Sequence, residues 1–120
     1  MKINQLIKKC LIDDDAIVTY PFKDTKGDNN PILRHKSNNK WFGVIFEQND
    51  TLYINLKAKP IDISVLKDQY PDVILPAWHM NKQHWYKVDV NKIDKKLFDR
   101  LIKNSFDITK SKIRKQKTEN

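Results

Sequence analysis

Three short β-like runs, separated by connections of only a few polar residues, restrict the fold of this chain more than any other feature. Residues 32–36, 40–46 and 51–57 are enriched in β-branched and aromatic side chains, which is typical of strands. The polar residues 37–39 and 48–50 connect them. Connections of this length are typical of hairpins, so the sequence predicts a three-stranded antiparallel meander.

Two further β-like runs lie in the second half of the chain. Residues 73–78 and 84–90 are joined by the polar segment 79–83, and they predict a fourth and a fifth strand. The lysine-rich stretch 23–30, which contains Gly27, has instead the composition of a loop. No helix is expected to cross it.

Three segments carry helix signals. Residues 2–12 place apolar side chains at the spacing of an amphipathic helix, and the same spacing begins again after Asp94. Asp62 can cap a shorter helix, which ends before Pro71 because proline disfavours a helical residue before it. The buried positions expected in this shorter helix include Val65 and Leu66.

The predicted fold is α+β, an antiparallel five-stranded sheet packed by helices in the order α-β-β-β-α-β-β-α. At 120 residues the chain is long enough for one core and too short for two. We therefore expect a single domain over residues 1–107, followed by the end of the last helix and a basic tail over residues 108–120. Alternation along the strands predicts that the inward-facing residues include Trp41, Ile45, Ile54 and Leu56.

The chain is basic, with a net charge of +8. Residues 108–120 hold five Lys or Arg against one Glu, and so contribute +4 of that total. Clustered cations favour a polyanion such as nucleic acid, because binding releases condensed counterions from the phosphates. The alternative is a solvated terminus that serves solubility alone. The tail residues expected to contact phosphates are Lys110, Lys112, Arg114, Lys115 and Lys117.

The single cysteine, Cys10, cannot form an internal disulfide, which favours a reducing, cytoplasmic setting. It lies on the apolar stripe of the first helix, so we expect a buried and unreactive thiol. Lysines interrupt the apolar residues of segment 1–12, which argues against a signal peptide, and nothing approaches the roughly 18 apolar residues of a membrane span.

Segment 78–85 combines two tryptophans, two histidines, an asparagine and a lysine. Such side chains can stack on bases and bind phosphates. The structural alternative is that Trp78 and Trp85 bury their rings in the core and that Asn81 stabilises a tight turn. The candidate nucleic-acid contacts in this segment are His79, Asn81, Lys82 and His84.

Metal binding and catalysis find little support in the sequence. His79 and His84 are five residues apart with no cysteine nearby, so at most two zinc ligands are present. The acidic run 13–15 is better explained as a solvated helix end than as a site for a hard cation. Gly27 and Gly43 are the only glycines, which excludes a glycine-rich phosphate loop. We expect no catalytic residues, no metal and no cofactor.

Several segments match a known family in order and spacing. Residues 70–73, followed by segment 78–85, resemble the signature of the MmcQ/YjbR family of small bacterial proteins. Residues 20–22, 41–43, 54–57 and 105–107 extend the resemblance over nearly the whole chain. The resemblance implies a double-wing fold similar to that of the bacterial frataxin homologue, and a DNA-binding role. The chain is least similar to the family in residues 23–30 and after residue 107.

The leading hypothesis is a non-catalytic DNA-binding protein that contacts phosphates through basic residues. The first alternative is a protein-interaction or regulatory adaptor that docks through the aromatic hairpin 78–85. A frataxin-like metal-binding protein is the third. Salt dependence separates the first two, because phosphate binding weakens steeply as salt rises and an apolar docking surface does not.

Overall fold

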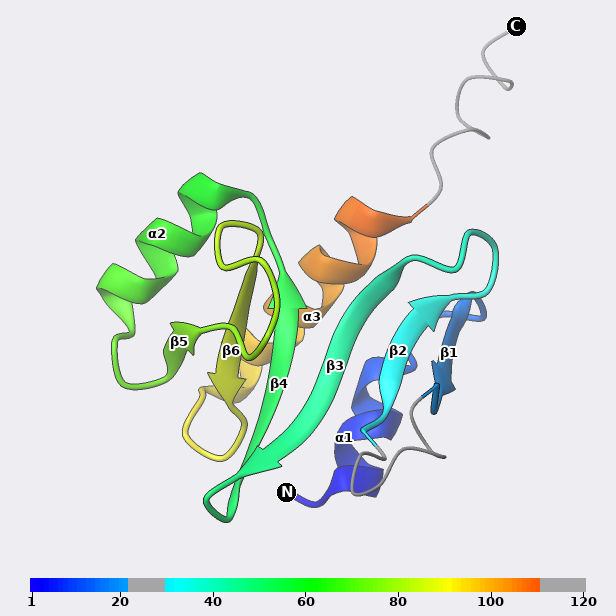
Figure 1. The fold of residues 1–120 in the computed structure, drawn as a ribbon, viewed down its shortest axis with the longest axis horizontal. Coiled ribbons are helices and arrows are strands. Elements are labelled where there is room, and N and C mark those ends of the chain that lie inside the picture. Colours follow the sequence, from blue (N-terminus) through cyan, green and yellow to red (C-terminus); the bar gives the residue numbers. More distant parts are fainter. Residues whose placement is uncertain (22–29, 111–120) are drawn as a thin grey trace, which may run out of the picture.

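The computed structural model describes residues 1–21 and 30–110, which form three helices and one six-stranded antiparallel sheet (Figure 1). The strand order is β1-β2-β3-β4-β6-β5, so the predicted α+β class and antiparallel sheet are confirmed, with one strand more than expected. The elements are α1 (Ile3–Cys10), β1 (Ala16–Thr19), β2 (Ile32–His35), β3 (Trp41–Gln48), β4 (Thr51–Lys57), α2 (Pro60–Gln69), β5 (Ile74–Pro76), β6 (Trp85–Asp89) and α3 (Lys95–Thr109).

The strand absent from the sequence prediction is β1. It pairs antiparallel with β2, with Ala16 opposite His35 and Thr19 opposite Ile32. Its four residues directly follow the acidic run, and a segment of this length is too short to show a strand period. It lies at the edge of the sheet, where short strands are common. The loop expected at 23–30 falls almost entirely outside the described residues.

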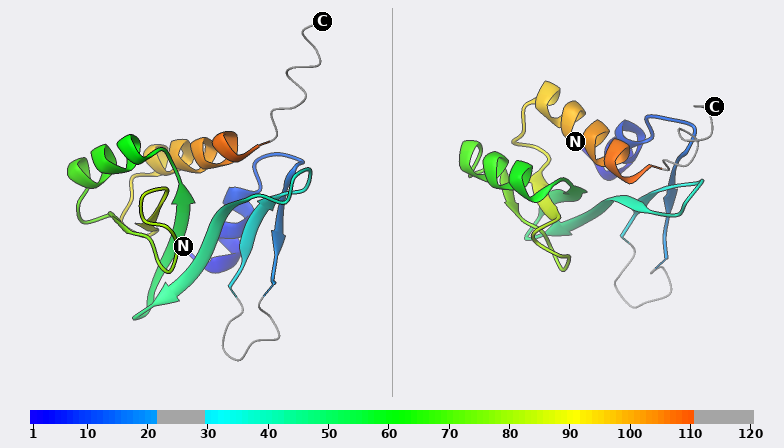
Figure 2. Two further views of the ribbon diagram at one scale, coloured as in Figure 1. Left: turned by 45° about the horizontal axis from the view of Figure 1, so that its top comes forward. Right: turned by 90° about the horizontal axis from the view of Figure 1, so that it is seen from above.

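Helices α1 and α3 cover one face of the sheet, and α2 lies at the β5 end (Figure 2). The predicted start of α3 is confirmed, because the Asp94 carboxylate accepts a hydrogen bond of 3.0 Å from the Leu97 backbone N–H. The helix ends at Thr109, two residues beyond the domain boundary expected at 107. Of the described helices, none is long and apolar enough to cross a membrane.

Helix α2 departs from the prediction at both its start and its buried face. It begins at Pro60, whose fixed φ suits the first helical position, and not after Asp62. Ile63 is its buried residue, Leu66 is partly buried, and Val65 is exposed, so the prediction for Val65 was wrong. A helix that packs against the short end strand β5 has only a narrow apolar contact.

The core lies between α1, α3 and the sheet. Ile45, Ile54 and Leu56 are fully buried there, as predicted, and Cys10 is fully buried on α1. Trp41 is only half-buried and does not belong to this core. The prediction for Trp41 was wrong because a β-bulge interrupts the alternation of β3.

The bulge lies in β3 where it pairs with β2. Leu33 is opposite Gly43, but the next residue, Arg34, is opposite Trp41, which leaves Phe42 as the extra residue. Phe42 packs into the helix-side core. Trp41 is therefore carried to the opposite face, here called the open face, which the loop between β5 and β6 crosses in Figure 1.

Candidate functional site

Asn55, near the middle of β4, fastens the β5–β6 loop to the open face. Its side chain is fully buried, its Nδ2 donates to the Trp78 carbonyl at 2.9 Å, and its Oδ1 accepts from the Trp78 N–H at 3.1 Å. The next residue, His79, has a φ of 61°, in the left-handed region that a histidine seldom adopts. The two hydrogen bonds thus hold the loop in a conformation that it would not favour alone.

Sequence reasoning missed Asn55 as a site residue. The signal was present, because Asn55 interrupts an otherwise apolar run at a position that alternates with Ile54 and Leu56. A polar side chain buried on one face of a strand needs a hydrogen-bond partner, which here is the loop backbone.

A row of aromatic rings extends across the open face from β4 to the loop. The ring of Trp78 stacks on Phe46, with centroids 4.4 Å apart and planes 20° apart. Phe46 stacks in turn on Tyr53, with centroids 5.5 Å apart. The Lys87 ammonium lies 4.4 Å from the Tyr53 ring centroid, within the range of a cation–π interaction. The row therefore ends in a positive charge.

Two adjoining pockets lie beside this row, and we call them together the aromatic groove. The first has a volume of about 440 Å³ and the second about 380 Å³, and they share Trp41 and Met80. No carboxylate is among the described residues that line either pocket. The first is lined by Asn30, Trp41, Val44, Trp78, His79, Met80 and Asn81, and the second by Asn39, Lys40, Trp41, Lys57, Met80, Trp85, Ile108 and Thr109.

The structure places the four candidate contacts of segment 78–85 in one exposed loop at this groove. His79 and Asn81 line the first pocket, and the His79 ring centroid lies 4.5 Å from that of Trp78. Lys82 and His84 are exposed in the same loop. The expected turn role of Asn81 is confirmed, because its Oδ1 accepts from the Gln83 N–H at 2.8 Å.

The two tryptophans of the segment differ in burial. Trp85 is buried on β6, as the structural alternative expected, and the Lys57 ammonium lies 5.6 Å from its ring centroid. Trp78 remains half-buried and forms part of the pocket wall. Segment 78–85 is therefore both a structural clamp and an accessible surface.

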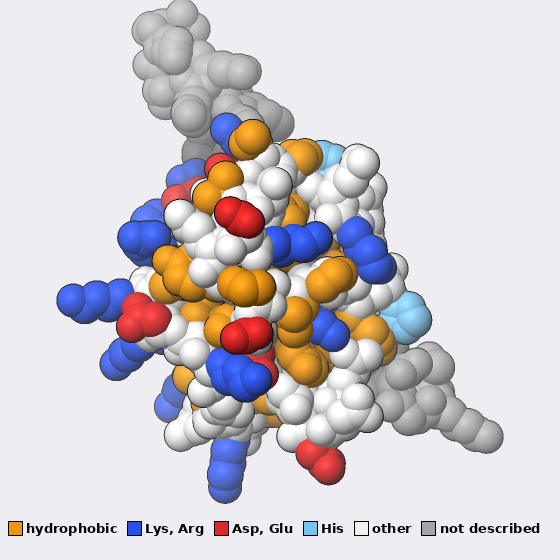
Figure 3. All heavy atoms as spheres, turned by 90° about the vertical axis from the view of Figure 1, so that its left-hand side faces the viewer, with side chains coloured by type: hydrophobic (Ala, Val, Ile, Leu, Met, Phe, Trp, Pro, Cys, Tyr) orange, Lys and Arg blue, Asp and Glu red, His pale blue; other side chains and the backbone are white. Residues whose placement is uncertain are grey.

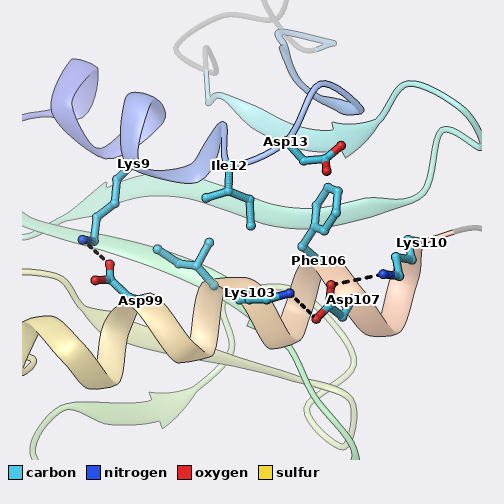
Figure 4. Close-up of a pocket in the computed structure, with 9 residues that line it drawn as sticks. Lys9, Ile12, Asp13, Asp99, Lys103, Phe106, Asp107 and Lys110 are labelled. Carbon is cyan, nitrogen blue, oxygen red and sulfur yellow. Dashed lines mark hydrogen bonds and ion pairs between the residues drawn. The ribbon is translucent and has the colours of Figure 1, made fainter.

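Lys110 is not brought together with the loop. Its ammonium lies 3.6 Å from the Asp107 carboxylate, at the end of a pocket of about 350 Å³ between α1 and α3 (Figure 4). Lys103 donates to the same carboxylate at 2.9 Å, and Lys9 pairs with Asp99. Each lysine of this pocket thus already has a carboxylate partner, which leaves little attraction for a phosphate. The other predicted tail contacts, Lys112, Arg114, Lys115 and Lys117, lie outside the described residues.

The acidic run contributes a structural carboxylate. Asp15 accepts hydrogen bonds from the Ser37 N–H at 2.8 Å and the Ser37 hydroxyl at 2.7 Å, and it lies 3.1 Å from Nδ1 of the buried His35. Partial burial would raise the pKa of Asp15, but the hydrogen bonds from Ser37 and His35 outweigh it and hold that pKa below its usual range. Across residues 1–21 and 30–110, no three His, Cys, Asp or Glu side chains are grouped as a metal site would require.

The chain is similar to known proteins over most of its length. A model of the YjbR family matches residues 14–108. The uncharacterized protein YyaQ of Bacillus subtilis (strain 168) is 32% identical over 103 residues, covering 76% of this chain and 83% of that protein. A crystal structure of a Pseudomonas syringae protein has a TM-score of 0.77 at 28% identity, over 92% of this chain and all of that one. A Deinococcus radiodurans structure with a DUF419 domain, at 23% identity and a TM-score of 0.73 over 87% of this chain and 75% of its own, shows likeness of fold alone.

Proposed function

The chain belongs to the YjbR family, and from that premise we propose that it is a non-catalytic nucleic-acid-binding protein that contacts DNA through the aromatic groove. The observation that carries the proposal is the composition of the groove. Trp41 and Trp78 line the first pocket, and Lys40 and Lys57 line the second, which shares Trp41, with no carboxylate among the described lining residues. Stacking rings next to unopposed cations suit a ligand made of bases and phosphates.

The distribution of ion pairs supports this choice of surface. Among the described residues, the Lys–Asp pairs lie on the helix side of the sheet and involve Lys9, Lys103 and Lys110. Lys57 and Lys87 of the open face lie near aromatic rings and belong to none of these Lys–Asp pairs. Nearby carboxylates therefore neutralise the charge of these lysines less than that of the helix-side lysines. A polyanion would be attracted more strongly to the open face.

The test is a DNA titration over a salt series with charge-matched variants. The double variant Lys40→Gln/Lys82→Gln removes two cations of the open face, and Lys95→Gln/Lys96→Gln removes two exposed cations from the start of α3. We expect the first double variant to flatten the slope of log affinity against log salt by about 0.9 for each lost contact with duplex DNA, or about 0.7 with a single strand. The second should keep the wild-type slope. Equal effects of both variants, or affinity that does not respond to salt, would contradict the proposal.

One observation favours a second candidate, a protein-interaction adaptor. Helix α2 exposes Ile61 at 69% and Val65 at 47%, and Tyr70 beside it at 38%. Figure 3 faces this end of the molecule and shows apolar side chains across its centre. The adaptor hypothesis thus gains its support from α2 more than from the hairpin 78–85. A salt-independent partner whose binding is lost in Ile61→Ser/Val65→Ser would favour it.

A further inference from the structure

We infer that the aromatic groove accepts an unpaired base, so that the preferred ligand is single-stranded nucleic acid. The inference rests on the proposed function and deepens it by naming the class of ligand. Phosphate binding alone would need only exposed cations. The groove provides in addition a recessed apolar pocket of about 440 Å³ whose walls include Trp41, Trp78 and Met80.

The shape of this site discriminates between paired and unpaired bases. In a duplex, each base is stacked on its neighbours and its ring faces are covered. A base therefore reaches a recessed indole only after it unpairs and leaves the stack, which costs free energy. A single strand presents its ring faces without that cost, and aromatic platforms bind such strands with little dependence on sequence. A pocket walled by indoles therefore favours the unpaired strand.

The pocket walls are held in place before any ligand arrives. The backbone of Trp78 is fixed by one hydrogen bond that it accepts from Asn55 and one that it donates to Asn55, and its ring is fixed by the stack on Phe46. The bulge at Phe42 sets Trp41 on the open face. Walls that are already ordered lose little conformational entropy on binding, which raises affinity for a ligand that fits.

The second pocket places cations where the phosphate backbone of a bound strand would run. The second pocket of the groove shares Trp41 and Met80 with the first and adds Lys40 and Lys57. A base in the first pocket would therefore leave its neighbouring phosphate near two ammonium groups. His79 and Asn81 supply polar groups at the edge of the first pocket, where they can bond to the edge of a base.

The experiment compares three fluorescent probes of equal length and equal salt on the full chain: a single-stranded DNA, the same strand in a duplex, and the same strand made entirely abasic. We expect the single strand to bind about tenfold or more tightly than the abasic strand, since stacking of a base on an aromatic ring strengthens binding. The duplex should also bind more weakly than the single strand. Equal binding of the single and abasic strands would overturn the inference.

Two variants separate the groove from general stability. Trp41→Leu keeps an apolar side chain but removes the indole, and it should abolish the preference for the single strand while leaving duplex and abasic binding unchanged. Tyr70→Leu, an exposed aromatic at the end of α2, is the control and should bind every probe as wild type does. If Trp41→Leu weakens all three probes equally with an unchanged melting temperature, the inference fails. Salt-sensitive binding without a preference for the single strand would overturn this inference but not the proposed function. If no probe binds, both the inference and the proposed function are overturned.

Discussion

The substitution Asn55→Ala tests whether one buried amide holds the β5–β6 loop on the sheet. It removes the donor to the Trp78 carbonyl at 2.9 Å and the acceptor of the Trp78 N–H at 3.1 Å. It also leaves space where a fully buried side chain stood. The strand ladder of β4 uses backbone groups and should survive the change.

The expected loss of stability follows from those contacts. Each hydrogen bond contributes about 0.5–1.5 kcal/mol net, and a buried backbone group left without a partner costs more. Since the Trp78 groups are only partly buried, water can satisfy them in part. We therefore expect a free energy of unfolding lower by about 2–3 kcal/mol.

Urea unfolding followed by far-UV circular dichroism measures this loss. With a slope of about 1–3 kcal/mol per molar urea, the midpoint should fall by about 1 M. The control is Asn104→Ala, which makes the same truncation at an exposed position of α3 and should leave the protein as stable or slightly more stable. Tryptophan fluorescence should shift in Asn55→Ala and not in the control, because Trp78 loses its anchor.

A midpoint for Asn55→Ala within about 0.2 M of wild type would refute the reasoning. It would mean that the loop conformation, including the positive φ of His79, is maintained by the ring stack of Trp78 on Phe46 and does not need the amide. A large loss of stability with unchanged single-strand binding would refute a different claim, namely that the hydrogen bonds between Asn55 and Trp78 order the groove for binding.

Burial raises the pKa of the Cys10 thiol to about 12, so a thiol reagent should label the native protein far more slowly than the urea-unfolded protein, and fast stoichiometric labelling would contradict this. Because the folded-state pKa of Asp15 is lowered, its stabilising effect is present above the unfolded pKa near 3.9 and is lost as pH falls through the folded value. The difference in urea midpoint between wild type and Asp15→Asn should therefore shrink below about pH 4, and a constant difference would exclude the mechanism. The buried hydroxyl of Tyr86 has no hydrogen-bond partner among the described residues, so Tyr86→Phe should be neutral or stabilise by up to about 1 kcal/mol in the same assay, and a clear loss would reveal a missed partner. Truncation after Lys110 should leave the melting temperature nearly unchanged and flatten the salt dependence of DNA binding, and an unchanged slope would remove the tail from the proposed interface. The cut lies after residue 110 because the Thr109 hydroxyl lies 2.8 Å from Nε2 of His35.

Local patterns predicted the parts of this fold that are stabilised locally. The hairpin β3–β4 follows from turn length, and the start and buried face of α3 follow from helical spacing after Asp94. These signals lie within a few residues of the element that they specify, so one sequence suffices to find them. The capping aspartate expected at Asp62 was wrong, because α2 begins at Pro60.

The missed features depend on partners that are distant in the sequence. Trp41 faces outward because of a bulge against β2, and alternation alone cannot show an extra residue. Val65 is exposed because α2 meets only the end of the sheet. The role of Asn55 depends on a loop 23 residues further along the chain. The composition of segment 78–85 did indicate an accessible aromatic and basic surface, but Trp41, Lys40 and Lys57 join it only through the sheet.

The contacts of α3 also constrain the order in which the chain can fold. The Ser105 hydroxyl donates to the Phe42 carbonyl across 63 positions of sequence, and the His35 ring meets Thr109 across 74. Contacts between such distant residues form only after a large loop has closed, which is slow compared with hairpin formation. The β2 end of the sheet therefore cannot reach its final packing until α3, which follows every strand in the chain, has docked. During synthesis, Phe42 and the other helix-side residues of the hairpin β3–β4 would stay exposed until that last helix docks.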